Sequence, residues 1–341
     1  MTNSPRKSRA SGRVTLDDVA ASAGVSRITA SRALRGERSV GAELVLRVAD
    51  AAAALGYGPD PAARALASAR SHTVVVLIPL LSNNLFVDLL EAVHRVLHPA
   101  GYQILIGLTH YDPQEEEALL TSYLAHRPAG LLVTGFDRTS RCEELIARSG
   151  VPCVHLMETS QNSSVHCVGF SQQDAGRAIT EHLLQRGRKR IAFAAAQLDP
   201  RVRQRLAGYR QALTAAGQYD PALEWLSPMP SSLALGGQLL ETHTQAGQEV
   251  DAIFFCNDDL AQGGLLAALR LGLTVPQQLA IAGFNDLAGS DQMWPPLTTV
   301  RTPRVEIGRS AATMLLSLMR QEPVAQTSVD VGWELVVRQS T

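Results

Sequence analysis

From residue 73 onward, short apolar runs alternate with segments of helical periodicity. The runs read TVVVLIP, YQILIGL, AGLLVTG and VPCVHL, and after VHCVGF the alternation restarts with RIAFAAA, AIFFCN and LAIAGF. Buried strands alternating with helices predict a parallel sheet with right-handed crossovers, and the restart predicts two doubly wound halves. Ligands of such sheets bind beyond the carboxyl ends of the strands, so we expect a ligand cleft between the two halves.

The segment before this region predicts a small all-α domain. Thr15 precedes an apolar-periodic stretch and lies three residues before Asp18, which is a capping-box arrangement at the start of a helix. Gly24 follows where the chain must turn with positive φ, and Ser26 is placed to cap a second helix. A third helix is predicted in GAELVLRVADAAAALGY, and its apolar side consists of Leu44, Val48, Ala51 and Leu55.

The second helix, in SRITASRALRG, has an apolar residue outside its apolar stripe. Ile28 is surplus to the core and is predicted to point outward with Arg27, Ser31 and Arg32. The major groove of DNA explains an exposed isoleucine between arginines, because arginine pairs with guanine edges and an aliphatic side chain contacts the thymine methyl group. An ordinary helical hairpin is the alternative interpretation.

The charge distribution also indicates nucleic acid. Residues 1–72 contain 11 Lys and Arg and 6 Asp and Glu, a net charge of +5, whereas the whole chain carries −1. A basic head on an acidic body favours a polyanionic partner for the head. Short basic N-termini are also common without such a partner. The charge therefore adds to the argument from the helical pattern but does not by itself indicate nucleic acid.

Residues 15–36 resemble the helix-turn-helix of the LacI/GalR family of bacterial transcription regulators, whose signature reads T-x-x-D-V-A-x-x-A-G-V-S-x-x-T-V-S-R. This chain departs from the signature at Ala30, where valine is usual. The resemblance implies sequence-specific binding to double-stranded operator DNA, with Arg27 and Ile28 as the base-reading pair. The DNA-binding residues that it implies in the headpiece are Thr15, Ser26, Arg27, Ile28, Thr29, Ser31 and Arg32.

The segment YGPDPAARALASARSH follows the headpiece and is too short for a helix that is stable alone. In the family this segment is a hinge helix that folds on the operator and enters the minor groove. The resemblance assigns Arg64 to phosphate and Leu66 to a wedge between base steps. Without the headpiece, a flexible linker would be the simpler interpretation.

The rest of the chain resembles the family as well, through LSNNLF and through CNDDLAQGGLLAALRLGLTVPQQLAIAGFNDL. The resemblance implies a periplasmic-binding-protein-like effector domain, built from two doubly wound parallel-sheet subdomains. Polar residues that follow strands are candidates for the effector site, although each of them could simply cap the next helix. The expected effector-binding residues are Ser82, Asn83, Phe86, Thr134, Glu158, Phe170, Arg201, Arg205, Asn257 and Asn285.

The charges expected around this cleft favour an anionic effector. Asn285 stands where the family usually has aspartate, Leu80 replaces a usual acid, and Arg201, Arg203 and Arg205 follow one strand. Guanidinium groups bind carboxylates bidentately, so a sugar acid fits better than a neutral sugar. The stretches PLLSNNLF, THYDPQEEE and AAAQLDPR resemble those of regulators of gluconate and ketogluconate utilisation. We therefore expect gluconate, 2-ketogluconate or a phosphorylated relative to release the repressor, with a neutral sugar or another metabolite as the alternative.

The expected domains are a headpiece over 1–58, a hinge over 59–72 and an effector domain over 73–341. Within the last, one subdomain is expected over 73–170 plus 303–330, and the other over 171–302 plus 331–341. Symmetric DNA half-sites require a homodimer, which the family forms through the body. The segments 86–98 and 259–271 are candidate dimer faces.

Other classes of function are weakly supported. We find no G-x-G-x-x-G after a first strand, no G-x-x-x-x-G-K-[ST], no G-x-S-x-G and no H-E-x-x-H, so an enzyme is not expected. The four cysteines lack metal-binding or redox spacing, so we expect neither a metal nor a cofactor. No apolar signal segment or membrane span is recognised, which favours a cytoplasmic protein over an exported sugar-binding protein.

Overall fold

The computed structural model describes residues 14–34, 36, 39–58, 71–81 and 84–341. The chain divides into two compact units, Met1–Ser71 and His72–Thr341, which we call the headpiece and the body. Within the described residues, no helix combines the length and apolar character needed to cross a membrane. Four residues with an expected role lie outside the described residues: Arg64, Leu66, Ser82 and Asn83.

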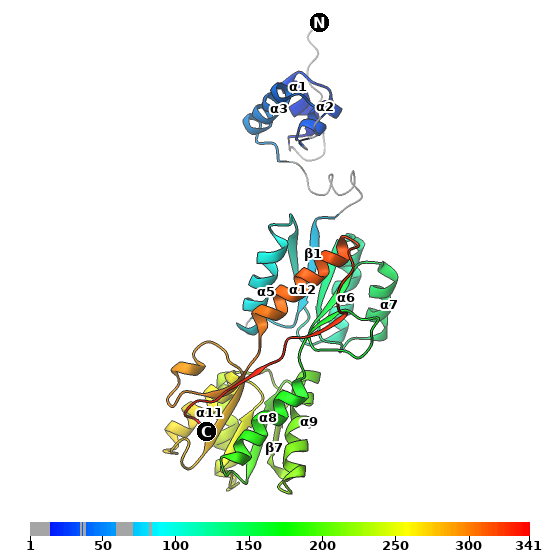
Figure 1. Ribbon diagram of the computed structural model, residues 1–341. Coiled ribbons are helices and arrows are strands. Elements are labelled where there is room, and N and C mark those ends of the chain that lie inside the picture. Colours follow the sequence, from blue (N-terminus) through cyan, green and yellow to red (C-terminus); the bar gives the residue numbers. More distant parts are fainter. Residues whose placement is uncertain (1–13, 35, 37–38, 59–70, 82–83) are drawn as a thin grey trace. The chain divides into compact units, whose positions relative to one another are not determined.

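The described residues of the headpiece form three helices, α1 (Leu16–Ala23), α2 (Arg27–Leu34) and α3 (Ala42–Ala54) (Figure 1). The capping box at the start of α1 is confirmed, because the Thr15 side chain accepts a hydrogen bond from the Asp18 amide and the Asp18 carboxylate accepts one from the Thr15 amide. Gly24 ends α1 with a φ of 65°. The helices enclose a small core around Val19, Ala30 and Val48, each of them fully buried.

The prediction that Leu55 belongs to this core is wrong. Helix α3 ends at Ala54, and Leu55 is its C-cap, with 37% of its surface exposed. The chain then turns through Gly56, whose φ is 65°, and the Tyr57 amide donates to the Ala52 carbonyl at 2.8 Å. This reversal brings Tyr57 against the core, and Ala52 supplies the buried position on α3.

The first lobe of the body is a six-stranded parallel sheet with the order β11-β5-β4-β3-β1-β2. Alternate residues of β1 face opposite sides: Val74 and Val76 pack toward the main core, whereas Val75 and Leu77 form a separate cluster with Leu120. Helices α5 (Asn84–Leu97) and α12 (Arg304–Met319) pack together on the main core, and α6 (Pro113–Ala125) and α7 (Ser140–Ser149) cover the other face (Figure 1). The strands are β1 (Thr73–Ile78), β2 (Gln103–Leu108), β3 (Gly130–Thr134), β4 (Cys153–Met157), β5 (Cys167–Gly169) and β11 (Ser328–Asp330).

The second lobe has the order β12-β10-β9-β8-β6-β7, in which β12 alone runs antiparallel to its neighbour, β10. Helix α8 (Gln172–Gln185) packs against α9 (Pro200–Ala215), and α10 (Leu233–Gln245) packs against α11 (Asp258–Arg270). At Gly208 a Cβ atom would collide with the backbone of α8, so this pair of helices meets backbone to backbone. The strands are β6 (Ile191–Ala196), β7 (Glu224–Ser227), β8 (Ala252–Phe255), β9 (Ala280–Asn285), β10 (Thr298–Arg301) and β12 (Glu334–Val336), and the 3-10 turns are η1 (Pro221–Leu223) and η2 (Ser290–Gln292).

The chain passes between the two lobes three times. The crossings lie between β5 and α8, between β10 and α12, and between β11 and β12. Each lobe is therefore assembled from separate stretches of sequence, and three adjacent connections join the lobes next to the carboxyl ends of the strands.

Candidate functional site

The first turn of α2 presents the side chains expected to contact DNA. The Ser26 hydroxyl accepts a hydrogen bond from the Thr29 amide at 3.1 Å and lies 2.8 Å from the Thr29 hydroxyl, which fixes the start of the helix. Ile28 is 65% exposed, as expected from its place outside the apolar stripe. Arg32 is exposed as well, and Ser31 is half-buried. One exposed face of α2 therefore gathers an aliphatic side chain, two guanidinium groups and hydroxyl groups.

Arg27 and Thr15 each interact with an acidic residue of α1. Arg27 forms an ion pair with Asp17 at 3.3 Å, and both side chains are more than 60% exposed. Such a pair contributes little free energy, so the guanidinium can exchange it for another anion at low cost. Thr15 is occupied by the capping box, and its backbone and side-chain hydrogen bonds lower the pKa of Asp18. Thr15 therefore caps the start of α1.

Arg205 is a buried cation of the body that forms no ion pair with a carboxylate among the described residues. Its side chain is buried; Nε donates to Gln172 Oε1 at 2.9 Å, and Nη1 donates to the Cys256 carbonyl at 2.6 Å. The guanidinium lies over the Phe284 ring, 3.8 Å from its centroid. Burial lowers the pKa of Arg205, because desolvation disfavours the charged form. Neutral groups therefore hold this charge in a position suited to an anionic ligand.

Two asparagines follow strands of the same lobe. Asn257 caps α11 by accepting a hydrogen bond from the Leu260 amide at 3.0 Å, and its amide group donates to Ser231 at 2.7 Å. Asn285 ends β9 with a φ of 111°, and its side-chain oxygen accepts a hydrogen bond from the Thr302 hydroxyl at 3.1 Å. Both side chains are buried beyond the carboxyl ends of their strands, on the same edge of the sheet. They supply neutral donors and acceptors.

Asp258 is a structural residue that lies next to the expected site residue Asn257. Its buried carboxylate accepts hydrogen bonds from the Thr299 hydroxyl at 2.7 Å, the Leu287 amide at 2.7 Å and the Ser290 hydroxyl at 3.1 Å. Burial raises its pKa to about 6. Asp258 thereby connects the start of α11 to the loop that follows β9, and Asn285 is the last residue of that strand. Its position directly after a capping asparagine was the available sequence signal.

The remaining expected residues of the first lobe and of the crossover contribute in different ways. Phe86, in the first turn of α5, packs into the core and is 2% exposed. Thr134 donates its hydroxyl to the Leu77 carbonyl at 3.0 Å, which ties the end of β3 to β1. Phe170 is buried in the first crossing between the lobes and stacks with Phe284 at 6.4 Å between centroids. Phe170 thus connects to the ring beneath Arg205.

Arg201 and Glu158, two further expected residues, pair with one another. Arg201 Nη1 lies 3.2 Å from Glu158 Oε2 and 3.1 Å from Asp137 Oδ1, and its Nε lies 3.0 Å from Asp199 Oδ1. Burial lowers the pKa of Arg201, but the three carboxylates more than offset this effect and raise it above its usual range. Arg203, the third arginine of the run, is exposed and donates to the Leu198 carbonyl.

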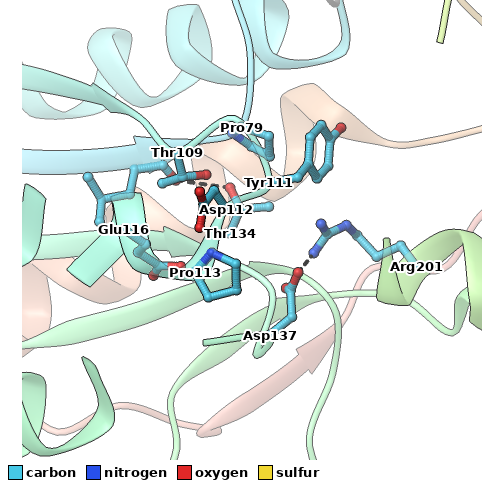
Figure 2. A pocket seen from close by; sticks show the side chains of 10 residues that line it. Pro79, Thr109, Tyr111, Asp112, Pro113, Glu116, Thr134, Asp137 and Arg201 are labelled. Atoms are coloured by element: carbon cyan, nitrogen blue, oxygen red, sulfur yellow. Dashed lines mark hydrogen bonds and ion pairs between the residues drawn. The ribbon is translucent and has the colours of Figure 1, made fainter. Parts of the chain in front are cut away.

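A small cavity lies beside Arg201, between strand ends of the first lobe and the start of α9 (Figure 2). Its volume is about 10 Å³, close to that of one water molecule. Thr134 and Arg201 are the expected residues that line it. Its other lining residues were not expected, although those of the THYDP stretch follow a strand end in the same way: Leu77, Pro79, Thr109, Tyr111, Asp112, Pro113, Glu116 and Asp137.

A buried polar network supports the floor of this cavity. Arg138 Nε lies 3.1 Å from Glu116 Oε1, and its other nitrogens donate to the Gly135 carbonyl and to His155 Nδ1. Burial raises the pKa of Glu116, and burial together with the Arg138 charge lowers that of His155 to about 4. His155 Nδ1 can accept from Arg138 only when it is unprotonated, whereas its 3.0 Å contact with the Gly135 carbonyl needs a protonated Nδ1, so the two bonds alternate with the tautomer. The network holds the loop that carries Asp137.

Among the described residues, no group of three or more histidine, cysteine, aspartate or glutamate side chains is arranged to hold a metal ion. The site consists instead of hydrogen-bonding groups, two buried guanidiniums and aromatic rings. This arrangement suits the recognition of a small polar molecule.

Comparison with known proteins assigns the family. Residues 15–60 match the model of the bacterial regulatory proteins of the lacI family, and residues 180–341 match that of the periplasmic binding protein-like domain. The chain is 54% identical to the HTH-type transcriptional regulator GntR of Pseudomonas aeruginosa, over 100% of this chain and 99% of the relative.

Solved structures give the same assignment. The transcription regulator GntR from Chromobacterium violaceum is 49% identical with a TM-score of 0.77, covering 79% of this chain and 98% of that one. The lac repressor dimer bound to operator and the anti-inducer ONPF is 26% identical with a TM-score of 0.85, covering 96% of this chain and 99% of that one. The chain belongs to the LacI family and is a DNA-binding transcriptional regulator rather than an enzyme.

Proposed function

We propose that the protein is a dimeric repressor that binds a specific operator through α2 and is released from it by a small sugar acid. The observation that carries the proposed effector class is Arg205. A guanidinium held by two neutral acceptors and an aromatic ring retains its full charge for a ligand, and a carboxylate is its best partner.

For the DNA half of the proposal, the exposed face of α2 enters the major groove. Arg27 and Ile28 contact base edges, and the other polar residues contact bases or phosphates: Ser26, Thr29, Ser31, Arg32 and, at the start of α1, Thr15. Arg64 and Leu66 act in the hinge, on phosphate and between base steps respectively. The lac repressor dimer on its operator supports two-fold symmetric binding for this chain.

For the effector half, the ligand carboxylate binds Arg205, and its hydroxyl groups bind the neutral amides of Asn257 and Asn285. Asn285 in place of the usual aspartate removes a negative charge near the proposed carboxylate. The other residues of the proposed site surround or support the ligand: Ser82, Asn83, Phe86, Thr134, Glu158, Phe170 and Arg201. Resemblance of PLLSNNLF, THYDPQEEE and AAAQLDPR to regulators of gluconate and ketogluconate utilisation supports gluconate, 2-ketogluconate or a phosphorylated relative.

A neutral sugar is the second candidate, and the cavity beside Arg201 favours it. The guanidinium there is compensated by carboxylates, and Asp112 and Glu116 add acceptors that suit hydroxyl groups. The polar lining of this end of the cleft suits the hydroxyl groups of a polyol chain, whether or not the molecule carries a carboxylate at its other end. The contribution of Arg205 to ligand binding therefore distinguishes a sugar acid from a neutral sugar.

Effector and operator are coupled through the body. An effector that prefers one orientation of the lobes shifts the equilibrium between them, and the same orientation decides whether the paired hinge segments can form. We propose that effector binding weakens operator binding and so relieves repression.

Calorimetry and operator binding together test the proposed effector and the proposed binding to DNA. The purified dimer is titrated with gluconate, 2-ketogluconate, 6-phosphogluconate and glucose, and operator release is followed by fluorescence anisotropy in the same buffer. Binding of the acids, with release of a footprinted operator upstream of neighbouring genes, is expected. Binding of glucose or of purines alone would overturn the sugar-acid assignment and leave the DNA assignment intact.

A further inference from the structure

Arg201 connects the two lobes of the body. Its backbone belongs to α9 of the second lobe, whereas Asp137 and Glu158 come from loops after β3 and β4 of the first. We propose that Arg201 is a latch that holds this orientation of the lobes and that the effector must break. This inference rests on the proposed function, because it describes how the same cleft is regulated.

The ion pairs of the latch are shielded from solvent. The Arg201 and Glu158 side chains are each 7% exposed, and Gln204 donates to the second Glu158 oxygen at 2.6 Å. Both carboxylate oxygens of Glu158 are thus bound by residues of α9. Breaking such buried pairs costs far more than breaking pairs on the surface, because the Glu158 carboxylate is left without its cation. The contacts favour this one orientation of the lobes.

Gly135 allows the latch to close. Its φ is 65°, and a Cβ at this position would meet Arg201 Nη1, Asp137 Oδ1 and Glu158 Oε2 closer than side-chain atoms pack. The absence of a side chain lets three charged groups converge on one point. Any larger residue there pushes the pairs apart without removing a charge.

The cavity shows why latch and effector exclude one another. Asp137 and Arg201 line it, and Figure 2 shows them pointing toward each other across its edge. A cavity of about 10 Å³ cannot hold a six-carbon acid, so the ligand enters only when its lining moves. The apparent affinity for the effector is then reduced by the fraction of molecules that are latched.

Arg201→Gln tests the latch in the full-length dimer, with the exposed Arg203→Gln as the matched control. Without the guanidinium, the ion pairs that join α9 to Asp137 and Glu158 are lost, and the lobes separate more readily. Gluconate affinity measured by calorimetry should rise about tenfold, and half-release of operator should need correspondingly less gluconate. Arg203→Gln should match the wild type. Weaker binding of gluconate by Arg201→Gln would overturn the proposal, because it would make Arg201 a direct ligand of the effector, and unchanged binding would overturn it as well.

Gly135→Ala provides a second test that retains every charge. It should raise gluconate affinity in the same direction as Arg201→Gln, and a decrease or no change would overturn the latch. If the wild type binds no gluconate, the proposed function fails, and hydrogen exchange then tests the latch alone. Faster amide exchange over 134–139 and 156–160 in both variants than in Arg203→Gln supports the latch, and equal exchange overturns it.

Discussion

The guanidinium carbon of Arg205 lies 3.8 Å from the centroid of the Phe284 ring. The ring fixes the plane of the guanidinium, while Gln172 and the Cys256 carbonyl fix its rotation. None of these three neutral groups compensates the positive charge of the guanidinium. A preorganised, partly desolvated cation loses little conformational entropy when it binds a carboxylate, which makes this pair the centre of the proposed effector site.

Replacing Arg205 by lysine should weaken gluconate binding by roughly 10- to 100-fold, because an ammonium neither stacks flat on the ring nor binds a carboxylate bidentately. Operator affinity without effector should remain, so the variant should resist release. Calorimetry and anisotropy measure the two effects. Arg203→Lys is the control, and an equal loss in that variant would argue against a specific role for Arg205.

Replacing Arg27 by alanine should lower affinity for the specific operator by about 1–3 kcal/mol and relax base preference at one position of each half-site. The headpiece should keep its stability, since Arg27 forms only an exposed pair with Asp17. Asp17→Asn removes the same pair and keeps the guanidinium. Anisotropy titrations against operator variants compare the two, and equal losses would assign the effect to the pair rather than to base contact.

His155 should make the body less stable in acid. Its pKa is about 4 in the folded chain, below the ordinary 6.5 that applies when it unfolds. Below pH 6.5 the unfolded state takes up a proton that the folded state does not, so the free energy of unfolding falls as the pH drops toward 4, by at most roughly 3 kcal/mol. Urea unfolding of the wild type and His155→Asn across this range isolates the contribution. Exposed His126→Asn should leave the pH dependence unchanged; an unchanged slope in His155→Asn would contradict the assignment.

Asp258 should act in the opposite direction. Its pKa is raised from 3.8 to about 6 by burial, so the folded state binds more protons and loses stability as the pH rises from about 4 through 6. Asp258→Asn can keep its hydrogen bonds, because the Thr299 hydroxyl can turn to accept from the amide. The variant should gain stability relative to the wild type, by at most roughly 3 kcal/mol, between pH 4 and 7. A constant difference across that range in urea unfolding would contradict this titration.

Much of the fold was predictable because it depends on local patterns. Apolar runs gave the two parallel sheets, and the fold class and the family are confirmed by the comparisons. The exposure of Ile28 followed from helical periodicity alone. The error at Leu55 arose because the periodicity continues past the point where Gly56 reverses the chain.

The electrostatics of the cleft were less accessible to sequence reasoning. Arg201 and Arg205 are four residues apart on one helix, yet one is enclosed by carboxylates and the other by neutral groups. Two of the three carboxylate partners of Arg201, Glu158 and Asp137, lie 43 and 64 residues away in sequence, so only the tertiary fold brings them to Arg201. The roles assigned to individual site residues stay predictions for this reason.

The third crossing between the lobes has a consequence for biosynthesis. Strands β11 and β12 are adjacent in the sequence, but β11 completes one sheet beside β5 and β12 completes the other beside β10. Neither sheet can acquire its outermost strand until the ribosome has translated this short stretch. A nascent or truncated chain that lacks it exposes the edges of β5 and β10 together, and unpaired strand edges promote aggregation.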